Sequence, residues 1–203
     1  MVRRCLLTAV LVLVAGAFAP AIPAAAAADP AALISNLGSR ALEVLGKNAN
    51  QSQRVARFRE LLREDFDVPG IARFVLGRYW NAATEEQRAE YVKLFEEYIA
   101  LAYSTRLAEY TGETFKVTGS RSDADGAIVS SQIIRPAGAA PVKVDWRLTG
   151  RNGIYKISDV LVDGISMAVT QRSEFASVIQ HNGGQVQGLI TMLRQKTAGS
   201  GAR

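Results

Sequence analysis

The sequence predicts an α+β protein with an antiparallel sheet of about four strands and about six helices, and three observations predict it. Apolar residues recur at helical spacing up to about residue 110, alternate with polar residues between 115 and 162, and return to helical spacing after 166. Plain turns separate the alternating stretches, which favours an antiparallel meander. Helices and strands that are segregated along a chain are typical of the α+β class.

Residues 1–28 have the three parts of a cleaved secretory signal peptide. Arg3 and Arg4 give a positive start, residues 6–18 are almost wholly apolar, and a tract of small residues follows up to Ala28. This order precedes an A-x-A cleavage site. The apolar run is shorter than the roughly 20 residues needed to cross a bilayer, which disfavours a membrane anchor and favours export to the periplasm.

The composition of the mature chain excludes several classes of protein. We expect one domain over residues 29–198 and a flexible tail over 199–203. The only cysteine, Cys5, lies in the predicted signal peptide, so the mature chain has no disulfide and no thiolate metal ligand. Without Arg3 and Arg4 the chain has 22 basic and 19 acidic residues, a net charge of +3. No block of Lys and Arg marks a nucleic-acid surface, so we expect no nucleic-acid partner.

Four helices are expected before the sheet. Asp29-Pro30 begins the first, with Asp as the cap and Pro in the first turn. Thr84 and Gln87 have the spacing of a capping box and open the longest helix. The apolar side of that helix is so wide that it must contact more than one neighbour. The expected bounds are about residues 30–45, 55–66, 67–75 and 85–110.

Four strands and two more helices complete the prediction. β-branched residues and alternating apolar residues predict the strands, at about residues 115–117, 127–134, 142–148 and 154–162. Asp163-Gly164 ends the sheet, and Ser166 can cap the fifth helix. Gly183-Gly184 separates this helix from the last one, which carries Leu189 and Leu193.

No catalytic set is recognisable in the sequence. His181 is the only histidine and lies at a helix end, where it interacts with the helix dipole or with solvent. No pair of acidic residues has metal-ligand spacing with it. No phosphate-binding loop, dinucleotide-binding motif or nucleophile elbow occurs. We therefore predict that the protein is not an enzyme and that it uses neither a cofactor nor a metal.

The segment Arg73-Phe74-Val75-Leu76-Gly77-Arg78-Tyr79-Trp80 is the most distinctive stretch. In one interpretation it is a core helix that ends at Gly77, with Trp80 packed below it. In the other it forms a wall of a ligand cavity, with an arginine near the entrance. Arg172 is expected to pair with Asp159 or Asp163 instead of contacting a ligand.

Two segments resemble a known family. Residues 66–80 are similar to the F-D…I-A-R-x-V-L-G-R-Y-W segment of MlaC-type proteins, also called toluene-tolerance proteins. Residues 162–179 are similar to the family's G-[VI]-S…Y-R-S-x-F segment, although Gln171 stands where the family often has tyrosine. The resemblance extends in order over essentially the whole mature chain.

The resemblance implies a periplasmic phospholipid carrier. Such a carrier would be a monomer that moves lipid between an outer-membrane lipoprotein complex and an inner-membrane ABC transporter with its substrate-binding subunit, and so maintains lipid asymmetry. It also implies a curved sheet and helices that enclose a deep apolar pocket. Three alternatives stay open: a carrier of a hopanoid or another apolar lipid, a non-catalytic periplasmic adaptor with a filled core, and a hydrolase of unknown type.

The pocket is predicted between the sheet and the longest helix, where the apolar faces must meet. We expect its lipid-binding residues to be Phe74, Leu76, Leu94, Tyr98, Val144, Trp146 and Leu161. Arg73 and Arg78 are expected near the lipid head group. Because each exposed methylene costs about 0.8 kcal/mol, burial of the acyl chains should outweigh any head-group contact.

Overall fold

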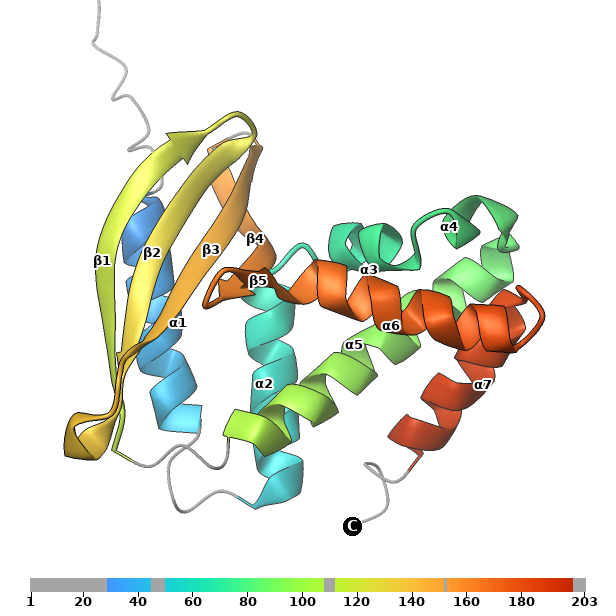
Figure 1. The fold of residues 1–203 in the computed structure, drawn as a ribbon, viewed down its shortest axis with the longest axis horizontal. Helices are drawn as coiled ribbons and strands as arrows, with labels where there is room; N and C mark the ends of the chain where they lie inside the picture. The colour runs from blue at the N-terminus through green and yellow to red at the C-terminus, as the bar shows by residue number, and fades with distance from the viewer. Residues whose placement is uncertain (1–28, 45–49, 108–111, 152, 199–203) are drawn as a thin grey trace, which may run out of the picture.

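The computed structural model describes residues 29–44, 50–107, 112–151 and 153–198 and confirms the α+β class. Within these ranges it has seven α-helices and one open, five-stranded antiparallel sheet with strands in sequence order. The predicted signal peptide, the tail over 199–203 and the predicted last turn of the longest helix lie outside the described residues. Figure 1 shows the curved sheet at one end of the molecule and most of the helices at the other.

The helices follow the predicted order, with one addition. Their bounds are α1 (Pro30–Val44), α2 (Gln51–Asp65), α3 (Val68–Leu76), α4 (Tyr79–Ala82), α5 (Glu85–Leu107), α6 (Met167–His181) and α7 (Val186–Thr197). The addition is α4, a single turn that is too short to show a periodic apolar pattern.

The sheet has one strand more than the predicted four. Its strands are β1 (Thr114–Asp123), β2 (Gly126–Ile134), β3 (Val142–Arg151), β4 (Ile154–Val162) and β5 (Ile165–Ser166). The added strand, β5, has only two residues and pairs with the end of β4. The turn between them places Asp163 and Gly164 at positive φ, 48° and 83°. This turn returns the chain along β4 before α6 begins.

The helix starts confirm two predicted caps. The Thr84 hydroxyl accepts from the Gln87 backbone N–H (3.2 Å), and the Thr84 backbone N–H donates to the Gln87 side chain (3.1 Å). These reciprocal bonds form the expected capping box of α5. The Ser166 hydroxyl accepts from the Val169 N–H (3.0 Å) at the start of α6.

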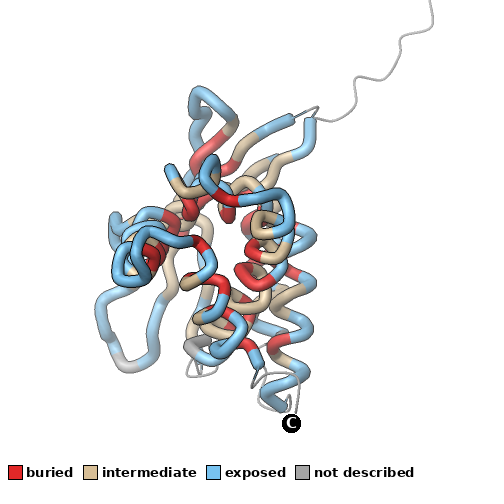
Figure 2. The backbone as a smooth tube through the Cα atoms, turned by 90° about the vertical axis from the view of Figure 1, so that its right-hand side faces the viewer, coloured by how far each residue is buried: buried red, intermediate tan, exposed pale blue. Residues whose placement is uncertain are grey.

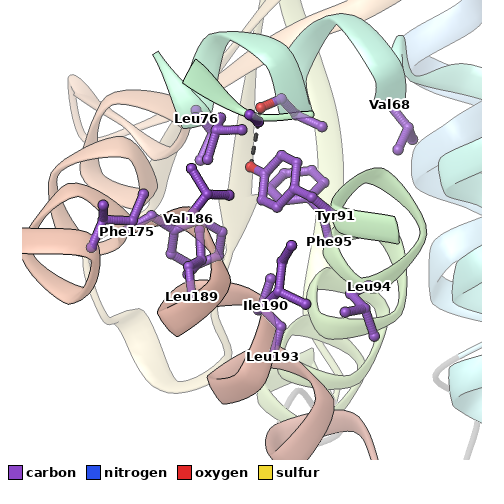
Figure 3. Close-up of a cluster of buried hydrophobic side chains, with 14 of the residues drawn as sticks. Val68, Leu76, Tyr91, Leu94, Phe95, Phe175, Val186, Leu189, Ile190 and Leu193 are labelled. Carbon is purple, nitrogen blue, oxygen red and sulfur yellow. Dashed lines mark hydrogen bonds between the residues drawn. The ribbon is translucent and has the colours of Figure 1, made fainter. Parts of the chain in front are cut away.

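Two separate clusters of buried apolar residues form the core. The larger joins α2, α3, α5, α6 and α7, and its fully buried members include Tyr91 and Phe175. Figure 3 shows its side chains pointing toward one another, with the Tyr91 hydroxyl donating to the Ala72 carbonyl (3.0 Å). The smaller cluster joins α1 and α2 to the sheet through Ile34, Leu148 and Ile157. Buried segments follow the inner sides of the helices in Figure 2.

The end of α2 ties the helices to the sheet. The Asp67 N–H donates to the Ile157 carbonyl of β4 (2.9 Å). Arg40 of α1 forms an ion pair with Asp65, which is buried at the end of α2. Burial raises the pKa of the Asp65 carboxyl above its ordinary value of 3.8, although the adjacent Arg40 acts in the opposite direction.

The buried Asp65 carboxyl predicts a pH dependence of stability. A raised pKa means that the Asp65 carboxyl binds a proton more tightly in the folded state than in the unfolded state. The contribution of Asp65 to the free energy of unfolding therefore falls as pH rises from 3.8 through the raised pKa. We expect wild type to lose stability relative to Asp65→Asn over that window. Urea unfolding of both proteins from about pH 4 to about pH 7 measures the difference. A difference that grows in favour of wild type as pH rises would show instead that the Arg40 ion pair dominates.

Candidate functional site

A cavity of about 580 Å³ lies between the sheet and the helices. This volume falls within the range of about 300–1,000 Å³ that is typical of ligand pockets. The cavity lies where the two apolar clusters meet, because its lining takes Leu62 and Val75 from the larger cluster and Leu37 and Leu61 from the smaller. It therefore borders both halves of the core.

Side chains from four neighbouring strands form the sheet wall of the cavity in rows. Phe115, Ile133 and Val142 pair across β1, β2 and β3, and all three line the cavity. Further along, Val144 pairs with Val162, and Trp146 pairs with Val160. Because residues directly opposite in a sheet share a face, these rows give one continuous apolar surface.

Four helices provide most of the opposite wall. Each presents residues at helical spacing to the cavity, which is the pattern of one helix face. The lining residues on these helices are Leu37, Gly38, Ala41 and Leu42 of α1, Phe58, Leu61 and Leu62 of α2, Val68, Ile71 and Val75 of α3, and Phe95, Glu96, Ile99 and Tyr103 of α5. Phe66 and the start of α6, with Met167, Ala168 and Gln171, close the remaining side.

The polar edge of Trp146 is satisfied within the sheet. Its Nε1 donates to the Ser131 hydroxyl (2.8 Å), which in turn donates to the Val144 carbonyl (3.1 Å). The Trp146 ring also contacts Phe115 edge to face, with 6.2 Å between centroids. A fixed aromatic wall with no unpaired donor suits an apolar ligand.

The charged residues that line the cavity are all acidic. The lining contains Glu96, Glu113, Asp159 and Asp163 and, in the part of the chain that the structure describes, no Lys or Arg. Asp159 is buried and accepts bonds from the Ser166 hydroxyl (2.6 Å) and the Ala168 N–H (3.1 Å). It therefore fixes the start of α6. Glu96 pairs with Arg63 at 2.7 Å.

Two of the seven apolar residues predicted to bind lipid, Val144 and Trp146, line the cavity. Leu76, Leu94 and Tyr98 instead belong to or pack against the larger apolar cluster. Phe74 is 44% exposed on the outer side of α3, whose cavity face carries Ile71 and Val75. Lipid contact by these six residues stays a prediction.

Leu161 lies on the opposite face of the sheet from the cavity. It pairs with Asp145, whereas its neighbours Val160 and Val162 pair with Trp146 and Val144. Successive side chains of a strand point to opposite faces. The prediction that Leu161 shares a face with Val144 and Trp146 was therefore wrong, and its neighbours Val160 and Val162 lie on that face.

Arginines predicted near the head group lie outside the cavity lining. The Arg73 guanidinium lies 5.9 Å from the Trp80 ring centroid, and that of Arg78 lies 4.9 Å from Tyr79. Their proximity to a lipid head group stays a prediction. The expected pairing of Arg172 with Asp159 or Asp163 was wrong. Arg172 lies over the Phe74 ring at 5.1 Å.

The remaining polar candidates show ordinary structural bonds. His181 Nδ1 donates to the Ser177 carbonyl one turn earlier in α6 (2.8 Å). Within the described ranges, no three His, Cys, Asp or Glu side chains gather as metal ligands would. No described helix combines the length and the apolar character needed to cross a membrane.

Sequence reasoning missed all of the helix residues that line the cavity in the described part of the chain. Ile99 and Tyr103 line the cavity, whereas the predicted Tyr98 packs on Phe175 with 5.8 Å between ring centroids. One residue turns a helix by about 100°, so adjacent apolar residues of α5 serve different neighbours. The helical spacing of Phe95, Ile99 and Tyr103 was the sequence pattern that could have identified the cavity face of α5.

A tight contact between α1 and β1 predicts the effect of one small substitution. A Cβ on buried Gly38 would lie 2.2 Å from Cδ1 of Phe115, a side chain that borders the cavity. We expect Gly38→Ala to push this ring into the cavity and lower the amount of bound apolar ligand several-fold, with a stability change below about 2 kcal/mol.

The control for Gly38→Ala is Ser39→Ala on the exposed side of the same helix. Solvent extraction measures ligand per protein, and urea unfolding measures stability. Unchanged ligand in Gly38→Ala together with a large loss of stability would show that the ring cannot move into the cavity.

Comparisons with known proteins give one family. The family model described as MlaC protein matches residues 36–195. The intermembrane phospholipid transport system binding protein MlaC of Haemophilus influenzae is 26% identical over 128 residues, which is 61% of this chain and 59% of that protein. A toluene tolerance protein of Pseudomonas putida is 28% identical over 127 residues, which is 61% of this chain and 58% of that protein. The match to each of these relatives thus spans less than two thirds of the relative's length.

A solved structure has the same fold. It is a phospholipid-binding protein from Ralstonia solanacearum in complex with a phospholipid, and it superposes with a TM-score of 0.70 at 23% identity. The match covers 85% of this chain and 99% of that one.

Proposed function

This chain belongs to the MlaC family, and from that premise we propose that it is a periplasmic carrier that holds a phospholipid by its acyl chains. The observation that carries the proposal is the cavity of about 580 Å³ with an almost wholly apolar lining. An empty apolar cavity of that size lowers the stability of a protein. That the fold nevertheless contains such a cavity indicates that an apolar molecule fills it. The alternative of an adaptor with a filled core has no comparable support.

Transport between membranes requires the chains to be enclosed. At about 0.8 kcal/mol for each methylene, two acyl chains left in water cost on the order of 20 kcal/mol. A cavity lined by Leu, Ile, Val and Phe solvates acyl chains about as well as a bilayer does. Weak contacts with partner proteins are therefore enough to decide whether the lipid enters or leaves the carrier. We propose that the partners are an inner-membrane ABC transporter with its substrate-binding subunit and an outer-membrane lipoprotein complex.

The cargo is identified by extracting the protein purified from the periplasm and analysing the extract by mass spectrometry. Phospholipid at about one molecule per protein is the expected result. A hopanoid in its place would establish a different cargo, and an extract without lipid would contradict the carrier function.

Export through a cleaved signal peptide is part of the same proposal. Fractionation of cells that express a C-terminally tagged protein should place it in the periplasm, with an N-terminus close to Asp29. Recovery of the uncleaved precursor in the inner membrane would contradict this expectation.

Affinity should depend on the chains more than on the head group. The described cavity lining has no Lys or Arg for a phosphate, and a charge-assisted hydrogen bond contributes only about 1.5–3 kcal/mol. We expect lipids with different head groups and identical chains to bind within about tenfold of one another. Shortening both chains should weaken binding far more, at about 0.8 kcal/mol per methylene. Competition for delipidated protein measures both, and tolerance of short chains would contradict the expectation.

A further inference from the structure

Three arginines stack on three aromatic rings on α3, on α6 and at the start of α4. The guanidinium groups of Arg172 and Arg78 lie 5.1 Å and 4.9 Å from the ring centroids of Phe74 and Tyr79. The third arginine stacks on Trp80 at 5.9 Å. We name this surface the Arg–aromatic patch and define it as Arg73, Phe74, Arg78, Tyr79, Trp80 and Arg172.

Gly77 leaves the space that the Arg172 side chain occupies. Gly77 has φ +57°, and a Cβ there would lie 2.9 Å from Nε of Arg172. A larger residue at this position would therefore displace the Arg172 side chain. Arg78 is held as well, because its Nη2 donates to the Tyr79 hydroxyl (2.9 Å). This hydrogen bond is also the main reason that the pKa of Tyr79 is lowered.

The positive charge of the patch is not neutralised within the described part of the chain. The ion pairs there use Arg40, Arg63 and Arg194. Arg73, Arg78 and Arg172 are all exposed. Each guanidinium has five N–H donors in a rigid plane, and Arg78 uses one of them on the Tyr79 hydroxyl.

We propose that the Arg–aromatic patch is a docking surface for a partner protein that presents carboxylates. Arginine forks bind carboxylates in a bidentate manner. Stacking on the rings fixes the guanidinium groups before binding, which lowers the entropy lost on association. Arg, Tyr and Trp are also the residues that dominate binding energy at protein interfaces.

A protein partner fits this surface better than a membrane does. Binding to a bilayer surface uses apolar side chains that insert between the lipids. In the patch, Tyr79 and Trp80 are half-buried, and Phe74, although 44% exposed, is stacked against the Arg172 guanidinium. The charged groups that the patch exposes are three planar cations, which select carboxylates of defined position.

The patch lies next to the cavity wall. Ile71 and Val75 of α3 and Met167 and Gln171 of α6 line the cavity, and other faces of the same two helices carry the patch. A docked partner would thus contact the helices that border the cargo. This consequence rests on the proposed function, whereas carboxylate binding by the patch does not.

The test uses a fluorescein-labelled octaglutamate peptide and the purified protein, with binding measured by fluorescence anisotropy at low salt. The patch variant is Arg73→Gln/Arg78→Gln/Arg172→Gln. The control variant, Arg121→Gln/Arg147→Gln/Arg151→Gln, removes three exposed arginines from the sheet. We expect the patch variant to bind the peptide roughly tenfold or more weakly than wild type, and the control variant to bind within about twofold of wild type.

Three results would overturn the proposal. The first is no peptide binding by wild type, and the second is equal weakening in both variants. The third is a loss of binding to phosphatidylglycerol vesicles in the patch variant while peptide binding is kept, which would assign the patch to a membrane. Extracted lipid per protein is measured in parallel and should be unchanged in the patch variant. Absence of lipid from wild type would contradict the carrier function without affecting the peptide result.

Discussion

Val162→Trp is expected to remove nearly all bound lipid from the purified protein, whereas Leu161→Trp should leave the lipid in place. Val162 lines the cavity and pairs with Val144, while Leu161 pairs with Asp145 on the other face of the sheet. An indole in the cavity that excludes two methylenes removes about 1.6 kcal/mol of binding. That loss alone exceeds tenfold, and the larger volume of an indole should raise it further.

The two variants form a matched pair, since they place the same side chain at adjacent positions of one strand. Lipid extracted per protein is the measurement, and urea unfolding shows that both variants are folded. Equal lipid in both variants would show that the lipid does not occupy this cavity. Loss from Leu161→Trp alone would place the lipid on the opposite face of the sheet.

Phe175→Ala should lower the free energy of unfolding by about 3–5 kcal/mol, the usual cost of removing a buried phenyl ring. Phe175 is 1% exposed and contacts the rings of Tyr91, Phe95 and Tyr98, with centroid distances of 5.8–6.3 Å. This ring joins α6 to α5 within the larger cluster. Its loss should therefore weaken the packing of the whole helical half.

The control is Phe74→Ala, because Phe74 is 44% exposed. This variant should lose less than about 1 kcal/mol. Urea denaturation with a common slope for all three proteins gives the comparison. Similar losses in both variants would mean that the cluster around Phe175 is not the main stabilising core.

Local patterns were sufficient to predict most of the fold. Apolar spacing, caps and turns act over a few residues, so all the α-helices except α4, and the four long strands, could be expected in order. The two elements that were not expected, α4 and β5, have four and two residues. Such segments are held by their neighbours, and their own sequence carries no periodic signal.

The cavity lining could be predicted only in part, because it depends on which elements pack together. On β3 the alternation of Val144 and Trp146 with charged residues identified the inner face. On α5 both sides are apolar, and only the packing of the neighbouring helices separates Ile99, in the cavity, from Tyr98, in the core. The stacking of Arg172 on Phe74 joins residues far apart in the sequence, and no local pattern indicates it.

The most direct test of chain burial in the cavity uses the two tryptophans of the protein. Trp146 lines the cavity and Trp80 lies in the Arg–aromatic patch outside it. Bromine on an acyl chain quenches only tryptophans that it contacts. When phospholipid with brominated chains is loaded, Trp80→Phe, which keeps Trp146, should be strongly quenched, and Trp146→Phe, which keeps Trp80, should not. Quenching of Trp80 with no effect on Trp146 would contradict the placement of the lipid chains in this cavity.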